Sequence, residues 1–226
     1  MARGSGKAQP SSVVAAELAF NRTVLSKGYQ KAYETLALDG ARSFDMRGEH
    51  SITALLKSAD VSGLIQQAKP HQIAMSCDGS VAVSAGRYIP SGGKGGSYYR
   101  IWSLQADRSY RIELEFVTPD GKPVDAPDII ETDVANCKES DAATRLSKFA
   151  PLQAEMERDA VKFAAKVHQG MAADNSLGWF AGHATEYDRD VLVTVFRNGD
   201  WHGALGEVTE ADLAPPPVPV PLKVEQ

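Results

Sequence analysis

The chain has 226 residues, of which 43% are hydrophobic and 23% charged, a balance typical of a globular protein with a substantial core. The formal net charge is −5 and the basic residues are scattered, so we do not expect nucleic acid or an anionic membrane as a partner. No apolar stretch reaches the ~20 residues that a membrane-spanning helix needs, and no signal peptide is recognisable. We therefore expect a soluble protein without a membrane span, cytoplasmic or, if a signal peptide was removed, periplasmic.

The N-terminal part of the chain has helical patterning. Residues 1–11 are polar, and we expect them to be disordered. Apolar residues at helical spacing then follow, Leu18 and Leu25 among them. They predict one long helix that ends near Gly40, or two helices that meet at Gly28.

The pattern then changes from helical to extended. A short strand is expected at 42–47 and a helix over 48–57, and Pro70 closes the helical part. Alternating apolar residues follow, interrupted by turn residues, as in antiparallel hairpins. The strands predicted from this alternation are 73–77, 81–88, 98–104 and 110–117.

The second half repeats the order of helix and strands. Residues 121–140 contain two prolines and predict a linker. A helix is expected from about Asp141, with Pro151 in its first turn, before a second set of strands that ends near 212. The proline-rich tail at 213–226 cannot form a ladder and is expected to be extended or disordered.

One sequence segment occurs twice in the chain. The twelve residues from Met75 to Gly86 share five identities with the twelve from Met171 to Gly182. Each copy leads into a hairpin that ends in Val-Thr. This similarity predicts a partial internal repeat.

The motifs of the first half have a known counterpart. They are Gly48–Leu56, Asp78–Tyr88, Tyr99–Trp102 with Gln105-Ala-Asp107, and Val117–Pro119. With the helix and strand order, residues 12–120 resemble the nuclear transport factor two-like superfamily, near its polyketide-cyclase-like and ketosteroid-isomerase-like bacterial proteins. The resemblance implies an α+β, cystatin-like fold in which helices pack on a curved antiparallel sheet, forming a cone with an apolar pocket.

The same resemblance bears on the second half and on assembly. In the superfamily the outer face of the sheet commonly pairs two subunits. Residues 141–212 have room for one helix and a sheet but are too short for a complete cone. We interpret them as a reduced second repeat whose sheet could take the place of a dimer partner. The expected states are a monomer with an internal pseudodimer or a homodimer.

The expected pocket contains tyrosines and one cation. We predict that it is lined by Tyr29, Tyr33, Tyr88, Arg100 and Trp102. When apolar residues are matched across the hairpin at 98–117, Arg100 lies on the same side as Trp102, where a cation needs an acidic residue or an anionic ligand as its partner. We favour the acidic residue.

The candidate catalytic groups are weak. The isomerases of the superfamily use a carboxylate base and a tyrosine donor, which here would be Asp45 and Tyr33. The apolar match turns Glu113 and Glu115 away from Trp102, so we expect both on a solvated face.

Metal and redox chemistry receive little support from the sequence. Cys77 and Cys137 form no Cys-x-x-Cys pair, and the histidines form no compact ligand set, so we expect neither metal nor cofactor. We favour two free thiols, with a disulfide as the alternative for a periplasmic protein.

These observations favour a noncatalytic protein that binds a small hydrophobic ligand, with or without an anionic head group. An isomerase or cyclase is the first alternative. A protein-interaction module whose pocket is filled by its own side chains is the second.

Overall fold

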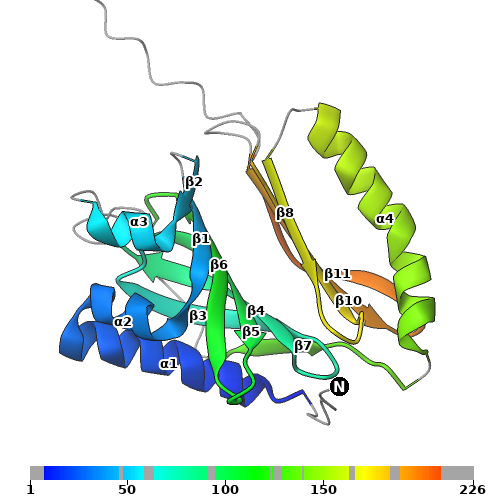
Figure 1. The fold of residues 1–226 in the computed structure, drawn as a ribbon, viewed down its shortest axis with the longest axis horizontal. Coiled ribbons are helices and arrows are strands. Elements are labelled where there is room, and N and C mark those ends of the chain that lie inside the picture. The colour runs from blue at the N-terminus through cyan, green and yellow to red at the C-terminus, as the bar shows by residue number, and fades with distance from the viewer. Residues whose placement is uncertain are drawn as a thin grey trace, which may run out of the picture.

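The fold is α+β with two sheets between outer helices, as seen in a computed structural model (Figure 1). Three helices lie on one side of a large sheet, and a smaller sheet with one long helix lies on the other. No described helix is both long and apolar enough to cross a membrane. The predicted tail at 213–226 and residues 1–7 lie outside the described residues. Those are 8–45, 48–58, 64–90, 95–122, 124, 129–138, 140–162, 166–183 and 189–209.

Two helices begin the fold, as the second of the two sequence alternatives predicted. Helix α1 spans Pro10–Lys27 and α2 spans Tyr29–Leu36. Gly28 between them has a φ of 84°, which residues with a side chain disfavour, so the chain turns there. The third helix is α3, Ile52–Lys57.

The large sheet has the order β2-β1-β6-β5-β4-β3-β7. It is mixed rather than wholly antiparallel, because β1 pairs parallel with β6 and β3 pairs parallel with β7. The bounds are β1 Ala37–Asp45, β2 Gly48–Ser51, β3 Gln67–Met75, β4 Val81–Ile89, β5 Gly96–Leu104, β6 Tyr110–Pro119 and β7 Glu131–Val134.

Three sequence expectations were wrong in this region. Strand β2 occupies the start of the helix expected at 48–57, and β7 lies inside the expected linker. Pro70 lies within β3 and does not precede it. The pairing of β3 with β4 shifts register between Pro70 and Gln72, and such an irregularity can accommodate a residue that has no N–H to donate.

The small sheet is an antiparallel meander of order β11-β10-β9-β8. Helix α4, Ala142–Lys162, precedes it, so that Pro151 lies inside this helix rather than in its first turn. The strands are β8 Lys166–Met171, β9 Leu177–His183, β10 Arg189–Arg197 and β11 Asp200–Thr209.

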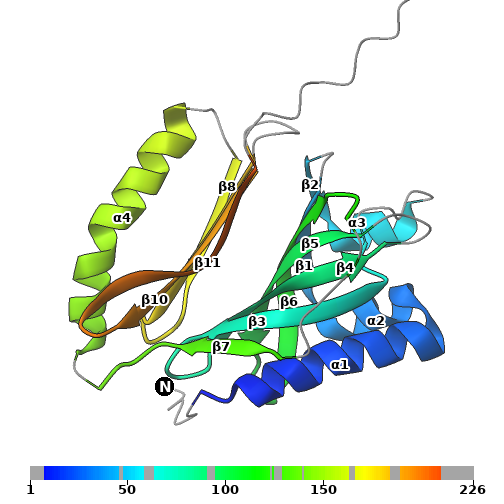
Figure 2. The same ribbon diagram turned by 180° about the vertical axis from the view of Figure 1, so that it is seen from behind.

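Buried apolar side chains form three layers. One cluster fills the space between α1–α3 and the inner face of the large sheet, by which we mean the face toward those helices. A second lies between the two sheets, and a third, around Phe149 and Trp201, lies between α4 and the small sheet. Figure 2 shows the order of the layers, from α1–α3 through the two sheets to α4. The outer face of the large sheet is thus covered by another part of the same chain.

A β-bulge in the β5–β6 pair changes which side chains face inward. Ile101 pairs with Leu114 but Trp102 pairs with Ile112, so that Glu113 is an extra residue. Because side chains alternate along a strand, one extra residue reverses the faces beyond it. Leu114 and Phe116 therefore pack between the sheets.

Candidate functional site

The inner face of the large sheet holds a buried ion-pair cluster centred on Arg100 of β5. Its Nη1 donates to Oε2 of Glu17 on α1 at 2.7 Å, and its Nε donates to Oε1 of Glu115 on β6 at 2.6 Å. All three residues are 0% exposed. The cation predicted to need a partner has two, both of them acidic residues.

Further hydrogen bonds connect both carboxylates to the surrounding elements. The Tyr33 hydroxyl of α2 donates to Oε2 of Glu115 at 2.7 Å and accepts the Ile65 N–H at 2.9 Å. On the other side, Ser84 Oγ of β4 donates to Oε1 of Glu17 at 2.5 Å and accepts the indole N–H of Trp102 at 3.0 Å. The network joins both helices to the three central strands.

Aromatic rings enclose the cation. The Cζ atom of Arg100 lies 4.2 Å from the ring centroid of Phe20, 5.5 Å from that of Tyr98 and 5.4 Å from that of Trp102. Guanidinium groups at such distances gain cation–π attraction, more so where water is excluded. The space around Arg100 is occupied by protein.

The cluster has one cation for two carboxylates. Burial raises the pKa of Glu115, although Arg100 and Tyr33 act in the opposite direction. Burial alone would lower the pKa of Arg100, but Glu115 and Glu17 hold it above its ordinary value, so the guanidinium stays charged. Burial and the nearby Glu115 raise the pKa of the Tyr33 hydroxyl well above its ordinary value.

The five predicted pocket residues lie in or beside this interior. Tyr33, Tyr88, Arg100 and Trp102 are each at most 1% exposed. Tyr29 is only half-buried and packs against the same apolar cluster. The structure thus brings Tyr33, Arg100 and Trp102 together. Each of them forms a hydrogen bond to another side chain of the protein.

The predicted carboxylates are distributed differently from expectation. Glu115 was expected on a solvated face and is fully buried, because the bulge turns it inward beside Arg100. Glu113, the bulged residue, lines the space between the sheets. Asp45 is 4% exposed and one of its oxygens lies 3.1 Å from Nε2 of His50.

Glu17, the second carboxylate of the cluster, was not predicted from the sequence. Leu18 and Leu25, which set the expected apolar stripe of the first helix, are 52% and 83% exposed. The buried side chains of α1 are Val13, Glu17 and Phe20. Their helical spacing could have identified the buried face of α1, but the glutamate among them interrupts the apolar pattern.

Cys77 and Cys137 form a disulfide, against the favoured expectation of two thiols. Their sulfur atoms and a carboxylate oxygen of Asp174 all lie within 4.8 Å of one another. Because both sulfurs are bonded to each other, this group offers no thiolate for a metal.

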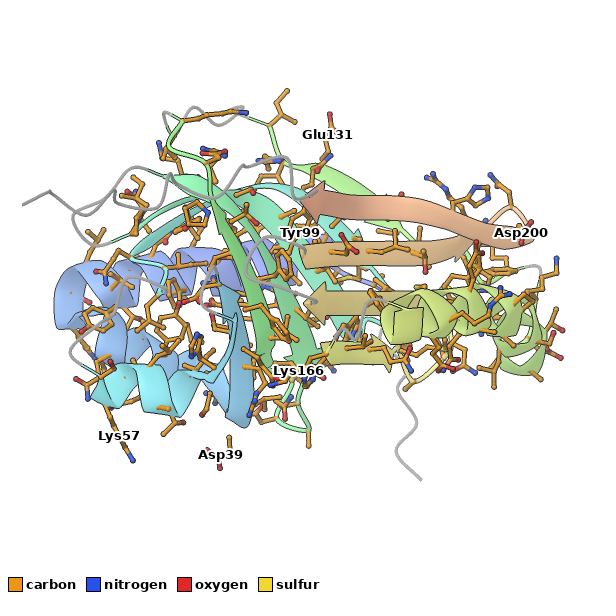
Figure 3. The ribbon with its side chains drawn as sticks, turned by 90° about the horizontal axis from the view of Figure 1, so that it is seen from above. Asp39, Lys57, Tyr99, Glu131, Lys166 and Asp200 are labelled. Atoms are coloured by element: carbon orange, nitrogen blue, oxygen red, sulfur yellow. A yellow bond between two sulfur atoms is a disulfide. The ribbon has the colours of Figure 1, made fainter. Side chains whose placement is uncertain are left out.

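The turns that precede β4 and β9 contact each other next to this disulfide. The Cys77 N–H donates to Oγ of Ser176 at 2.9 Å, and the Ala173 N–H donates to Oγ of Ser80 at 3.0 Å. Farther along the sheets, the Tyr99 hydroxyl donates to the Gly206 carbonyl at 3.1 Å. Figure 3 shows Tyr99 where the two sheets meet and Asp200 at the far end of the small sheet.

A cavity of about 420 Å³ lies between the sheets. Its walls come from β1, β2 and β6 on one side and from β8 and β9 on the other; Lys166 marks the start of β8 in Figure 3. The polar and aromatic side chains that line it are Arg42, Glu49, Glu113, His168 and Trp179.

Comparison with protein families and with curated proteins finds no match. Among solved structures, the chain is similar to a presumed ketosteroid isomerase from Shewanella frigidimarina NCIMB 400. The identity is 14% and the TM-score 0.37, over 47% of this chain and 94% of the other.

Proposed function

We propose that this protein is a noncatalytic binding protein of the nuclear transport factor two-like type whose cone interior is closed by its own side chains. The observation that carries this proposal is the cluster of Arg100, Glu17 and Glu115, all 0% exposed, in which Arg100 pairs with both carboxylates. Such a cluster fills the place where a pocket was expected. A filled interior is also what the second alternative, a protein-interaction module, would have, so any small-molecule site of the proposed binding protein would lie outside the cone.

The chemistry of the interior supports the noncatalytic assignment. A catalytic base must come within hydrogen-bond reach of a substrate proton. Glu115 has both oxygens engaged, by Arg100 and by Tyr33, and the Tyr33 hydroxyl also accepts a backbone N–H. Asp45 contacts His50 rather than Tyr33. The pair expected for an isomerase is thus directed toward protein partners.

Exchange of the Trp102 indole proton tests the closed interior. This proton is donated to Ser84 Oγ at 3.0 Å in a residue that is 0% exposed, so it should persist after transfer to D₂O. The Trp179 indole lies outside this interior, has no hydrogen-bond acceptor among the described residues and serves as the internal comparison. The two signals can be assigned with Trp102→Phe and Trp179→Phe variants. Equally fast exchange of both protons would mean an open interior and return the predicted pocket to consideration.

We further propose that residues 141–212 are the reduced second repeat and stand in for a partner subunit. The order β6-β5-β4-β3 in the large sheet has its counterpart in β11-β10-β9-β8. The bulge recurs as well, because Val193 pairs with Leu205 and Thr194 with Gly203, leaving one extra residue on β11 as on β6. Matching strand order and matching bulges support a common origin.

The contact between the turns supports the same proposal. The donors Cys77 and Ala173 are 96 positions apart, as are the acceptors Ser176 and Ser80, so the two cross-turn hydrogen bonds are reciprocal. Reciprocal contacts are the mark of a two-fold interface between identical surfaces. The division into residues 12–120 and residues 141–212 follows from this proposal, and the segment 121–140, which contains β7, connects them.

The disulfide supports an oxidising compartment, such as the periplasm, over the cytoplasm. Disulfides form and persist outside reducing compartments. Trapping thiols with a maleimide in intact cells of the natural host tests this, since protection of Cys77 and Cys137 is expected. Full labelling of both cysteines would contradict it.

A further inference from the structure

The cavity between the sheets has the size of a small-molecule site. Its volume of about 420 Å³ lies within the range of pockets that hold small ligands. It is separate from the Arg100 cluster, because its walls belong to the outer face of the large sheet and to β8 and β9.

Three of the four charged or ionisable side chains in this cavity already have partners. Glu49 forms an ion pair with Arg42, and its Oε1 lies 3.1 Å from Nε2 of His168. Burial would raise the pKa of Glu49, but His168 and Arg42 hold it below its ordinary value. Its side chain is 9% exposed, so this carboxylate is charged, enclosed and neutralised.

Glu113 is the carboxylate without a cation. It accepts a hydrogen bond from Ser103 Oγ, and no basic side chain in the described part of the chain lies within ion-pair distance of it. As the bulged residue of β6, it points toward the same space as the neighbouring Leu114. Bulges commonly redirect a side chain next to a functional site.

An aromatic ring forms another part of the wall. Trp179 is 5% exposed and lies against Gly170, where any Cβ would come within 2.5 Å of the indole ring. A glycine opposite the tryptophan therefore allows the ring to lie close to β8. Trp is the side chain whose face attracts organic cations most strongly.

The charges of the cavity favour a positive ligand. Arg42 and His168 both pair with Glu49, so Glu113 is the carboxylate of this cavity that has no basic partner among the described residues. We infer that this cavity binds a small organic cation, a protonated amine or a quaternary ammonium, whose charge pairs with Glu113 beside the face of Trp179. An anion would be repelled by the carboxylate of Glu113, whereas the Nη2 of Arg42 is already paired with Glu49.

Titration of the full-length protein with n-butylammonium chloride and with sodium butyrate tests the inference. The two ions have chains of equal length and opposite charge, and tryptophan fluorescence and calorimetry report binding. We expect saturable binding of butylammonium and none of butyrate. Glu113→Gln, which retains the shape and an acceptor for Ser103, should weaken butylammonium binding about tenfold, as expected for losing a charged hydrogen-bond partner. The matched control is Glu155→Gln on the exposed face of α4, which should bind like wild type.

Three results would overturn the inference: saturable binding of butyrate, no saturation with butylammonium, or wild-type affinity in Glu113→Gln. The inference deepens the proposed binding function, but the two can fail separately. If the Trp102 indole proton is protected and butylammonium does not bind, only the inference of an amine site is refuted. If that proton exchanges rapidly, the proposal of a closed interior is refuted, whichever result the titration has.

Discussion

Replacement of Arg100 by methionine should destabilise the fold by leaving two carboxylates buried without a cation. Glu17 and Glu115 are both 0% exposed, and Arg100 is the basic side chain that contacts them. Breaking a buried ion pair by removing one partner costs about 3–5 kcal/mol. Methionine fills much of the volume of arginine, so that the lost charge rather than a cavity dominates the cost. We expect Arg100→Met to lower the free energy of unfolding by this amount at pH 8.

The same variant should recover stability in acid. Burial raises the pKa of Glu115 in the folded protein above its ordinary value of 4.5, and loss of Arg100 raises it further. A raised folded-state pKa stabilises the fold below the unfolded pKa, and this contribution is lost as the pH rises through the folded pKa. The difference between Arg100→Met and wild type should therefore shrink from pH 8 to pH 5.

Urea unfolding followed by circular dichroism at both pH values measures these effects. The control is the triple variant Glu17→Gln, Arg100→Met, Glu115→Gln, which removes all three charges together and should recover much of the loss. A cost below about 1 kcal/mol at pH 8 would contradict this expectation, since it lies outside the range for a broken buried pair. So would a cost that stays constant between the two pH values.

Reduction of the Cys77–Cys137 disulfide should lower the free energy of unfolding by about 4 kcal/mol, because it opens a loop with a sequence separation of 60. Equal urea midpoints with and without reductant would contradict this. Ser80→Ala and Ser176→Ala each remove the acceptor of one cross-turn hydrogen bond and should each cost about 1 kcal/mol. Wild-type stability of either variant in chemical denaturation would argue against its cross-turn hydrogen bond. Gly86→Ala would bring a Cβ to 2.2 Å from a backbone oxygen of β3 and should cost about 1–3 kcal/mol in the same assay; wild-type stability would show that the strands can separate there.

Local signals in the sequence predicted most of the secondary structure. Gly28 separated α1 from α2, and turn residues bounded the hairpins, because backbone conformation at these places depends on neighbouring residues. Strand β7 was missed, since its four residues gain their partner only from β3, more than fifty positions earlier. Pro151 was expected in the first turn because proline favours that position, but a proline alone does not indicate how many helical residues precede it.

The candidate site was less accessible to sequence reasoning. Arg100 and Trp102 were correctly placed on the inner face, since both lie on a regularly alternating strand. Glu115 was assigned to the wrong face because one bulged residue, Glu113, reverses the alternation, and no residue type marks a bulge. Glu17 contributes to the site through tertiary contacts with Ser84 and Arg100, 67 and 83 positions away.

The cavity between the sheets depends on contacts that no local pattern reports. Glu49 and His168 come from opposite halves of the chain and meet at 3.1 Å. Their meeting depends on how the small sheet packs on the large one, which follows from the shape of the shared apolar layer.

The claim that the second half stands in for a partner subunit is tested most directly by native mass spectrometry of the gently purified full-length protein. We expect one species at the monomer mass of 24.3 kDa, because the outer face of the large sheet is already covered within the chain. A homodimer that persists at low concentration would contradict it.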